Sequence, residues 1–137
     1  MSFFVLLALP THITSPTPLL EACLHQQGDT DWIEDQKNPS DRRWSITHPP
    51  GTSVKEDFAL ISRVIDPTTD RIMVMVGGLL GYGTLAAGEF LSDPKYMAAF
   101  AQQAPAGWQK KNLQIVISTE VIKGNSGPPK ALAFYAW

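Results

Sequence analysis

The spacing of apolar residues predicts several strands in the second half of the chain. Apolar residues alternate with more polar ones over residues 113–121, and this period of two is typical of a half-buried strand. The run 72–76 is apolar at every position, which indicates a strand inside a sheet. The sequence DPTTD separates it from a mostly apolar run at 58–65, so the two runs predict a β-hairpin with Pro67 in the turn. A last strand is expected over 131–137.

Helices are predicted where apolar residues recur at three- and four-residue spacing. Three apolar residues within 20–24 share one face of a helix that we expect from Thr17 to Gly28. A second helix is expected over 84–91, with its first threonine as the cap. A third helix begins at Pro94, because Asp93 before it is a good capping residue.

Two segments of the first half follow neither period. Phe3 to Leu9 is an unbroken apolar run that is too short to span a bilayer as a helix. It lacks the basic residues that precede the core of a signal peptide, so we interpret it as a buried strand, with a remnant of a targeting segment as the alternative. Residues 29–43 are strongly polar and predict a loop anchored by Trp32.

The order of the expected elements is strand, helix, short strand, hairpin, helices and two further strands. A strand followed by helices and another strand usually forms a right-handed crossover between parallel strands, whereas pairs with short loops are antiparallel. We therefore predict an α/β fold, a small sandwich with a mixed, central, Rossmann-like sheet flanked by helices. The length of 137 residues fits a single domain spanning 1–137.

Charge and cysteine content argue against several kinds of partner and site. The 11 Lys and Arg residues are balanced by 13 Asp and Glu residues, which argues against the clustered basic surface that nucleic acids require. A single cysteine, Cys23, excludes an intrachain disulfide and a thiolate-rich zinc site, and it fits a cytoplasmic location. The histidines at 12, 25 and 48 lack metal-ligand spacing, so we predict neither a metal nor a cofactor.

One glycine-rich stretch, VMVGGLLGYGTLAAGEF at 74–90, is the strongest candidate for a ligand site. A strand runs here into a loop that opens a helix, and backbone N–H groups at a helix start can hold an anion. The phosphate-loop pattern of nucleoside triphosphatases fails, because Thr84 stands where its lysine must be. The dinucleotide fingerprint matches weakly, since no carboxylate follows Gly83 at about 20 residues.

Two interpretations of this loop stay open. The glycines can serve only a tight strand-to-helix turn and close packing, with Thr84 capping the helix. Alternatively, the loop cradles a small anionic ligand, and Glu89 in the following helix then becomes a candidate functional residue. The candidate ligand-binding residues are Gly78, Gly81, Gly83, Thr84 and Glu89. The catalytic residues are unknown.

Several strings in the second half resemble a family of uncharacterised bacterial proteins, often from acidobacteria. The matching segments are EDFALISRV, VGGLLGYGTLAAGEFLSDP, APAGWQKKNLQIVISTEVI and GPPKALAFYAW, which together cover about residues 56–137. The resemblance implies an α/β domain beside regulatory or membrane-anchored segments, and it implies no particular activity. The first half departs from the family, because its opening run lacks the glycine-rich turn that members tend to place after it.

Three functions are compatible with these observations. We expect a non-enzymatic ligand-sensing or regulatory module with an anion or nucleotide pocket at Gly78–Thr84, where the carboxyl edge of an open α/β sheet would place a ligand. The first alternative is a small enzyme acting on a nucleotide or phosphorylated compound, with Glu89 or Glu120 as the base. The second is a protein interaction domain or homodimer that uses the end of the final strand for pairing. We expect no membrane span.

Overall fold

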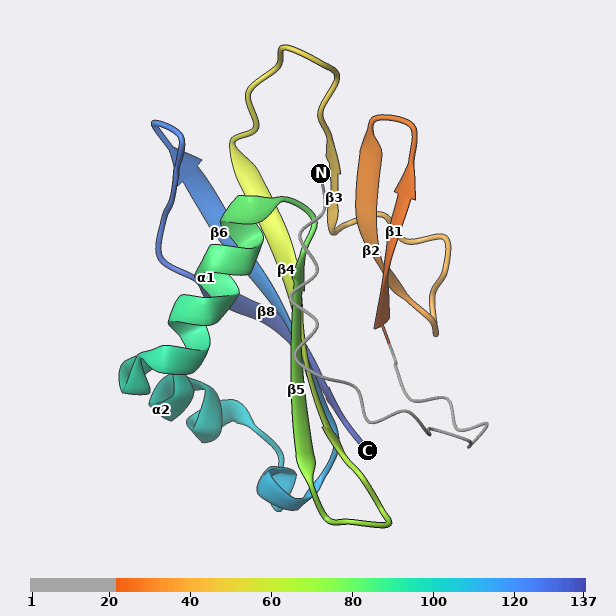
Figure 1. Cartoon of the computed structure of the whole chain (residues 1–137), viewed down its shortest axis with the longest axis vertical. Helices are drawn as coiled ribbons and strands as arrows, with labels where there is room; N and C mark the ends of the chain where they lie inside the picture. Colours follow the sequence, from red (N-terminus) through yellow and green to blue (C-terminus); the bar gives the residue numbers. More distant parts are fainter. Residues whose placement is uncertain (1–21) are drawn as a thin grey trace.

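The computed structural model describes residues 22–137, and its framework is a larger sheet that runs through the middle of the structure (Figure 1). Its strand order is β5-β4-β6-β8, and the short β7 pairs with the end of β6. Every pair in it is antiparallel. The strands are β4 (Glu56–Ile65), β5 (Ile72–Gly78), β6 (Leu113–Ile122), β7 (Asn125–Ser126) and β8 (Lys130–Ala136).

A smaller sheet lies beside the larger one (Figure 1). It consists of β1 (Ala22–Gln27), β2 (Thr30–Asp35) and β3 (Ser45–Thr47), again antiparallel. The strands β1 and β2 form a hairpin in which Gln27 pairs with Thr30. Gly28 adopts a φ of 60° in the turn between them, a conformation that glycine reaches without strain.

The helices cover the opposite face of the larger sheet. They are α1 (Gly81–Ser92) and α2 (Pro94–Gln103), followed by a 3₁₀ turn, η1 (Trp108–Lys110). The helix α1 packs chiefly against β4, β5 and β6. In α2, the Asp93 side chain accepts a hydrogen bond from the Lys95 amide at 3.0 Å, so the predicted cap is confirmed.

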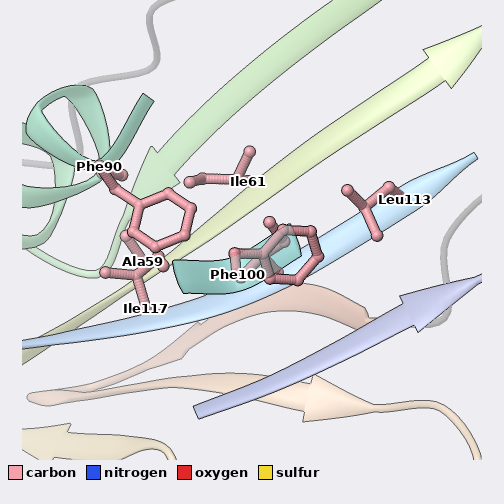
Figure 2. Packing of buried hydrophobic residues seen from close by; sticks show 8 residues of the cluster. Ala59, Ile61, Phe90, Phe100, Leu113 and Ile117 are labelled. Carbon is pink, nitrogen blue, oxygen red and sulfur yellow. The ribbon is translucent and has the colours of Figure 1, made fainter. Parts of the chain in front are cut away.

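Alternation along β4 separates two cores. Phe58 and Leu60 pack toward the smaller sheet, together with Ile33, Trp44, Ile46, Leu79 and Val116. Ala59 and Ile61 point the other way, toward the helices (Figure 2). This second core also contains Ala87, Phe90, Phe100, Leu113, Ile115 and Ile117. The central strands are apolar on both sides because they lie between these two layers.

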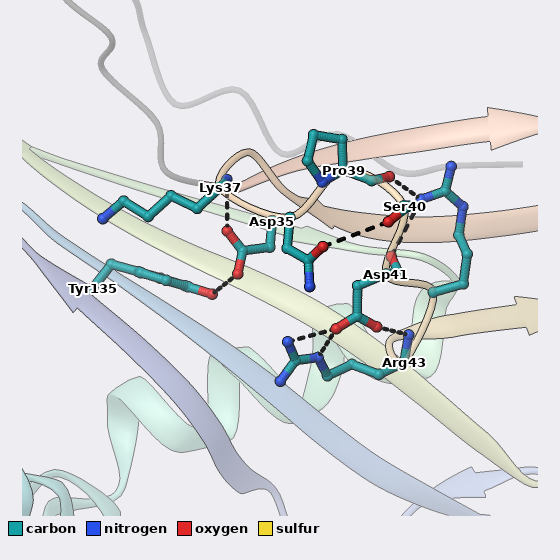
Figure 3. Close-up of polar contacts among 9 residues, drawn as sticks. Asp35, Lys37, Pro39, Ser40, Asp41, Arg43 and Tyr135 are labelled. Carbon is teal, nitrogen blue, oxygen red and sulfur yellow. Dashed lines mark hydrogen bonds and ion pairs between the residues drawn. The ribbon is translucent and has the colours of Figure 1, made fainter.

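A polar contact also joins the two sheets. Figure 3 shows Tyr135 of β8 donating a hydrogen bond at 3.1 Å to the carboxylate of Asp35, which ends β2. The same carboxylate accepts a hydrogen bond from the Lys37 amide at 2.9 Å. The contact ties the end of the smaller sheet to the last strand of the larger one.

The predicted α/β, Rossmann-like fold is wrong. Both β5 and β6 pair antiparallel with β4, so β5 and β6 run in the same direction and α1 and α2 do connect two parallel strands. However, β4 lies between them and opposes both, which removes every parallel pair from the sheet. The crossover rule describes the handedness of a connection between two parallel strands of one sheet, and it does not say whether another strand lies between them.

The predictions for the first half also need correction. Where a helix was expected from Thr17 to Gly28, the strand β1 occupies Ala22–Gln27, and the rest of that segment lies outside the described residues. The polar segment 29–43 contains the strand β2, in which Trp32 is buried as expected of an anchor. The apolar run Phe3 to Leu9 lies outside the described residues. The hairpin of β4 and β5 is confirmed, but β5 is an outer strand, so the prediction that residues 72–76 lie inside the sheet is wrong.

Candidate functional site

The amides at the start of α1 already hold an anion, which is a carboxylate of the protein itself. Asp57 in β4 is fully buried. Its carboxylate accepts hydrogen bonds from the amide of Gly83 at 2.6 Å and from the amide of Leu80 at 3.1 and 3.2 Å. It also accepts one from the Phe58 amide at 2.8 Å. Asp57 thus takes the position at the helix start where an external anion was expected.

Burial and hydrogen bonding act in opposite directions on this carboxylate. Burial raises the pKa of Asp57 above its ordinary value, and the nearby charge of Asp31 adds to the rise. The amides of Gly83, Phe58 and Leu80 counteract it, because they stabilise the ionised form. The effect of burial is the larger one.

Two of the candidate glycines allow close approach of the backbone. A Cβ atom on Gly83 would lie 2.4 Å from the carbonyl oxygen of Phe58, and one on Gly78 would lie 2.4 Å from the carbonyl oxygen of Leu80. Neither position tolerates a side chain without a shift of the backbone. Gly81 differs from both, since a Cβ atom there would meet nothing within 4 Å.

Thr84 and Glu89 are placed differently from the prediction. The helix α1 begins at Gly81, so Thr84 lies inside the first turn rather than at the cap. Its hydroxyl accepts a hydrogen bond from the Gly78 amide at 3.0 Å and closes the turn. The exposed Glu89 accepts a hydrogen bond at 3.1 Å from the hydroxyl of Tyr96 in α2, away from the turn.

A cavity of about 530 Å³ lies next to this turn. Three segments line it: the loop 48–55, the start of α1 with Leu80 and Tyr82, and the end of β6 with the turn at 121–124. We call it the loop 48–55 pocket. Leu80 and Tyr82 were not among the predicted ligand-binding residues, and none of the predicted ones lines the pocket. The pocket therefore lies next to the predicted site, at the start of the same helix.

Hydrogen bonds fix both ends of the loop that forms the pocket wall. At one end, His48 Nε2 lies 2.9 Å from Oδ2 of the buried Asp31, and the His48 amide donates to the Asp29 carbonyl at 2.8 Å. At the other end, the Lys55 carbonyl accepts a hydrogen bond from the Val121 amide at 2.8 Å. Both ends of the loop that forms the pocket wall are thus tied to neighbouring strands by hydrogen bonds.

Two lysines, Lys55 and Lys123, line the pocket from different segments of the chain. His48 also lines it, and its Nε2 atom contacts the buried Asp31 carboxylate. Among the described residues that line the pocket there is no aspartate or glutamate. In the described part of the chain, no ion pair engages the ammonium group of Lys55 or Lys123. Lysine ammonium groups that lack an ion pair among the described residues are suited to the binding of an anion.

Within residues 22–137, no cluster of three or more histidine, cysteine, aspartate or glutamate residues could hold a metal ion. No helix in that range is long and apolar enough to cross a membrane. Comparison of the chain with protein-family models, curated proteins and solved structures found no match. The resemblance of residues 56–137 to an uncharacterised bacterial family thus stays a prediction.

Proposed function

We propose that the protein is a non-enzymatic ligand-binding module that takes a small anionic molecule in the loop 48–55 pocket. The observation that carries this proposal is the pair Lys55 and Lys123, two ammonium groups without a described ion pair on the wall of a cavity that lacks carboxylates. A phosphate or carboxylate group between them would gain two charge-assisted hydrogen bonds. We place this module in the cytoplasm, as the single cysteine suggests.

The size of the cavity fits a ligand larger than a bare ion. Small-molecule pockets commonly measure about 300 to 1,000 Å³, and this one measures about 530 Å³. Tyr82 and Leu80, an aromatic and an aliphatic residue, also line the pocket. A nucleotide or a sugar phosphate has the matching combination of an anionic group and a less polar body.

The position of the acidic residues favours binding over the enzymatic alternative. Neither Glu89 nor Glu120 lines the pocket. Glu89 is hydrogen bonded to Tyr96, and Glu120 forms an ion pair with Lys130 at 3.3 Å. A general base has to reach the substrate directly or through one water molecule, and neither glutamate is among the residues that line the pocket.

A thermal-shift screen with nucleotides, dinucleotides and sugar phosphates tests the proposal, because a ligand that binds only the folded state raises the melting temperature. We expect at least one of these compounds to raise it. The single variants Lys55→Ala and Lys123→Ala should each lower affinity by roughly tenfold, since a charge-assisted hydrogen bond contributes about 1.5 kcal/mol. Isothermal titration calorimetry measures the change.

Lys110→Ala is the matched control, because Lys110 is equally exposed and lies in η1, outside the pocket. It should leave the affinity unchanged. A screen in which no anion shifts the melting curve would refute the proposed function. A ligand that binds both lysine variants as tightly as the original protein would place the site elsewhere.

A further inference from the structure

The larger sheet has two outer strands, β5 and β8, and among the described residues neither pairs with a strand on its outer side. The helix α1 packs chiefly on β4, β5 and β6, whereas Phe134 of β8 contacts Phe100 of α2. Within residues 22–137, β8 pairs only with β6, so its outer edge is unpaired there. An uncovered edge strand presents N–H and C=O groups that another strand can pair with.

The hydrogen bonds at the end of β8 determine which backbone groups point outward. The amides and carbonyls of Asn112 and Trp137 exchange hydrogen bonds of 3.0 and 3.2 Å. Hydrogen-bonded pairs alternate with non-hydrogen-bonded pairs along an antiparallel ladder. Phe134, opposite Ile115, and Ala136, opposite Leu113, therefore direct their N–H and C=O groups away from β6.

The side chains along the same edge are apolar and exposed. Leu132 is 46% exposed and Phe134 is 37% exposed. The Phe134 ring is anchored edge-on against Phe100 at 5.6 Å between centroids, and Phe100 in turn packs on Trp108 at 5.3 Å. The three aromatic rings thus form a continuous series of contacts from the helix-side core to the outer strand β8. An exposed aromatic ring that rests on a packed core is typical of an interface anchor.

We propose that β8 pairs with the β8 strand of a second copy of this chain, antiparallel and about a two-fold axis at Phe134. This register places the two Phe134 rings opposite each other and brings Leu132 opposite Ala136 of the second copy. The outward N–H and C=O groups of each Phe134 then bond to each other. Two four-stranded ladders join into one continuous sheet.

Charge favours a second copy as the occupant. No residue from Ala131 to Ala136 is charged, so self-pairing brings no like charges together. Lys130, the nearest charged residue, is already paired with Glu120 and lies beyond the paired stretch. A β-bulge between Val116 and Ile117 of β6 shifts the register next to Leu132, and pairing with β6 resumes at Ala131. The stretch from Ala131 to Ala136 is therefore free of charged side chains.

Sedimentation equilibrium over a concentration series measures the dimer directly. We expect the original chain to dimerise and Phe134→Lys to raise the dissociation constant by at least about tenfold, because it places two ammonium groups opposite each other. Leu85→Lys is the control: Leu85 is 67% exposed on α1, and the same change there should leave the dissociation constant unaltered. Circular dichroism confirms that both variants are folded.

Amide hydrogen exchange on the original chain provides a second measurement that needs no variant. The Phe134 amide should exchange more slowly as the protein concentration rises. A chain that stays monomeric up to about 1 mM, or a dimer that Phe134→Lys leaves intact, would overturn the proposal. A dimer that Leu85→Lys disrupts would place the interface on α1 instead. The outcome is independent of the ligand pocket, which lies on other segments.

Discussion

Asp57 organises the turn between β5 and α1. Its buried carboxylate accepts from the amides of Leu80 and Gly83, two donors that the helix itself cannot satisfy. A capping side chain commonly comes from the residue just before the helix, but here the residue at that position is Leu80, which has no side-chain cap. The carboxylate comes instead from β4, which does not adjoin the helix in the sequence, so no local sequence motif indicates it.

The close approach at Gly83 leads to a prediction at the scale of one residue. In Gly83→Ala the new methyl group would lie 2.4 Å from the Phe58 carbonyl oxygen and 3.1 Å from the Asp57 carboxylate. Either the helix start shifts or the carboxylate loses its amides, and we expect a loss of about 2 to 4 kcal/mol in the free energy of unfolding. Urea denaturation measures it.

Gly81→Ala is the matched control, because it lies in the same turn and a Cβ atom there meets nothing within 4 Å. It should be neutral or slightly stabilising, since alanine has the higher helix propensity. If both changes altered the free energy of unfolding equally, the lack of space around Gly83 would not be the reason for a glycine at that position.

The elements that the sequence predicted correctly have their signals within a short stretch. The hairpin of β4 and β5 follows from two apolar runs around a turn sequence, and α2 follows from Asp93 and Pro94. The strand β2 was missed because its composition is polar. Asp31 in it is nevertheless buried, and its Oδ2 atom lies 2.9 Å from Nε2 of His48, 17 residues further along the chain.

The candidate site illustrates the same limit. The loop 48–55 pocket is built from three segments that lie far apart in the sequence, so no spacing of residues could reveal it. The sequence left open whether the glycine-rich turn serves only close packing or also holds an anion, and in the structure the turn packs closely and holds a carboxylate of the chain itself. Its occupant, Asp57, could not be predicted, because only the pairing of β4 with β5 brings that carboxylate to the turn.

The cap of α2 supports a prediction at the scale of an element. The Lys95 amide, and to a lesser extent the Lys95 side chain, hold the pKa of Asp93 below its ordinary value of 3.8. The ionised carboxylate therefore stabilises the fold above about pH 4, and this contribution is lost as the pH falls through the lowered pKa. Asp93→Ala should reduce the melting temperature by a few degrees at pH 7.

Differential scanning calorimetry at several pH values measures this effect. The difference between the original protein and Asp93→Ala should shrink once the pH drops below about 4, because protonated Asp93 is a weaker acceptor. Asp93→Asn, which keeps a capping oxygen without the charge, should recover most of the stability at pH 7. A difference that persists unchanged at low pH would contradict the role of the ionised carboxylate.

At the scale of the whole molecule, the larger sheet packs against a different layer on each of its two faces. One core joins it to the smaller sheet, and the other joins it to the helices. Because β4 and β6 contribute side chains to both cores, loss of packing in one core also weakens these two strands in the other core. Tyr135 and Asp35 add a polar link between the sheets. We therefore expect the described part of the chain to unfold as one cooperative unit.

Ile33 tests this coupling, since it is 1% exposed in β2 and belongs to the core between the two sheets. Ile33→Ala should lower the free energy of unfolding by about 2 to 5 kcal/mol through lost burial and the cavity left behind. Hydrogen exchange should then accelerate by the same factor in β2 and in β6, because both open in the same event. Leu85→Ala, at an exposed position of α1, should change neither rate appreciably. Faster exchange confined to β1, β2 and β3 would mean that the smaller sheet unfolds separately, and that the wall formed by loop 48–55 can loosen while the helix layer stays intact.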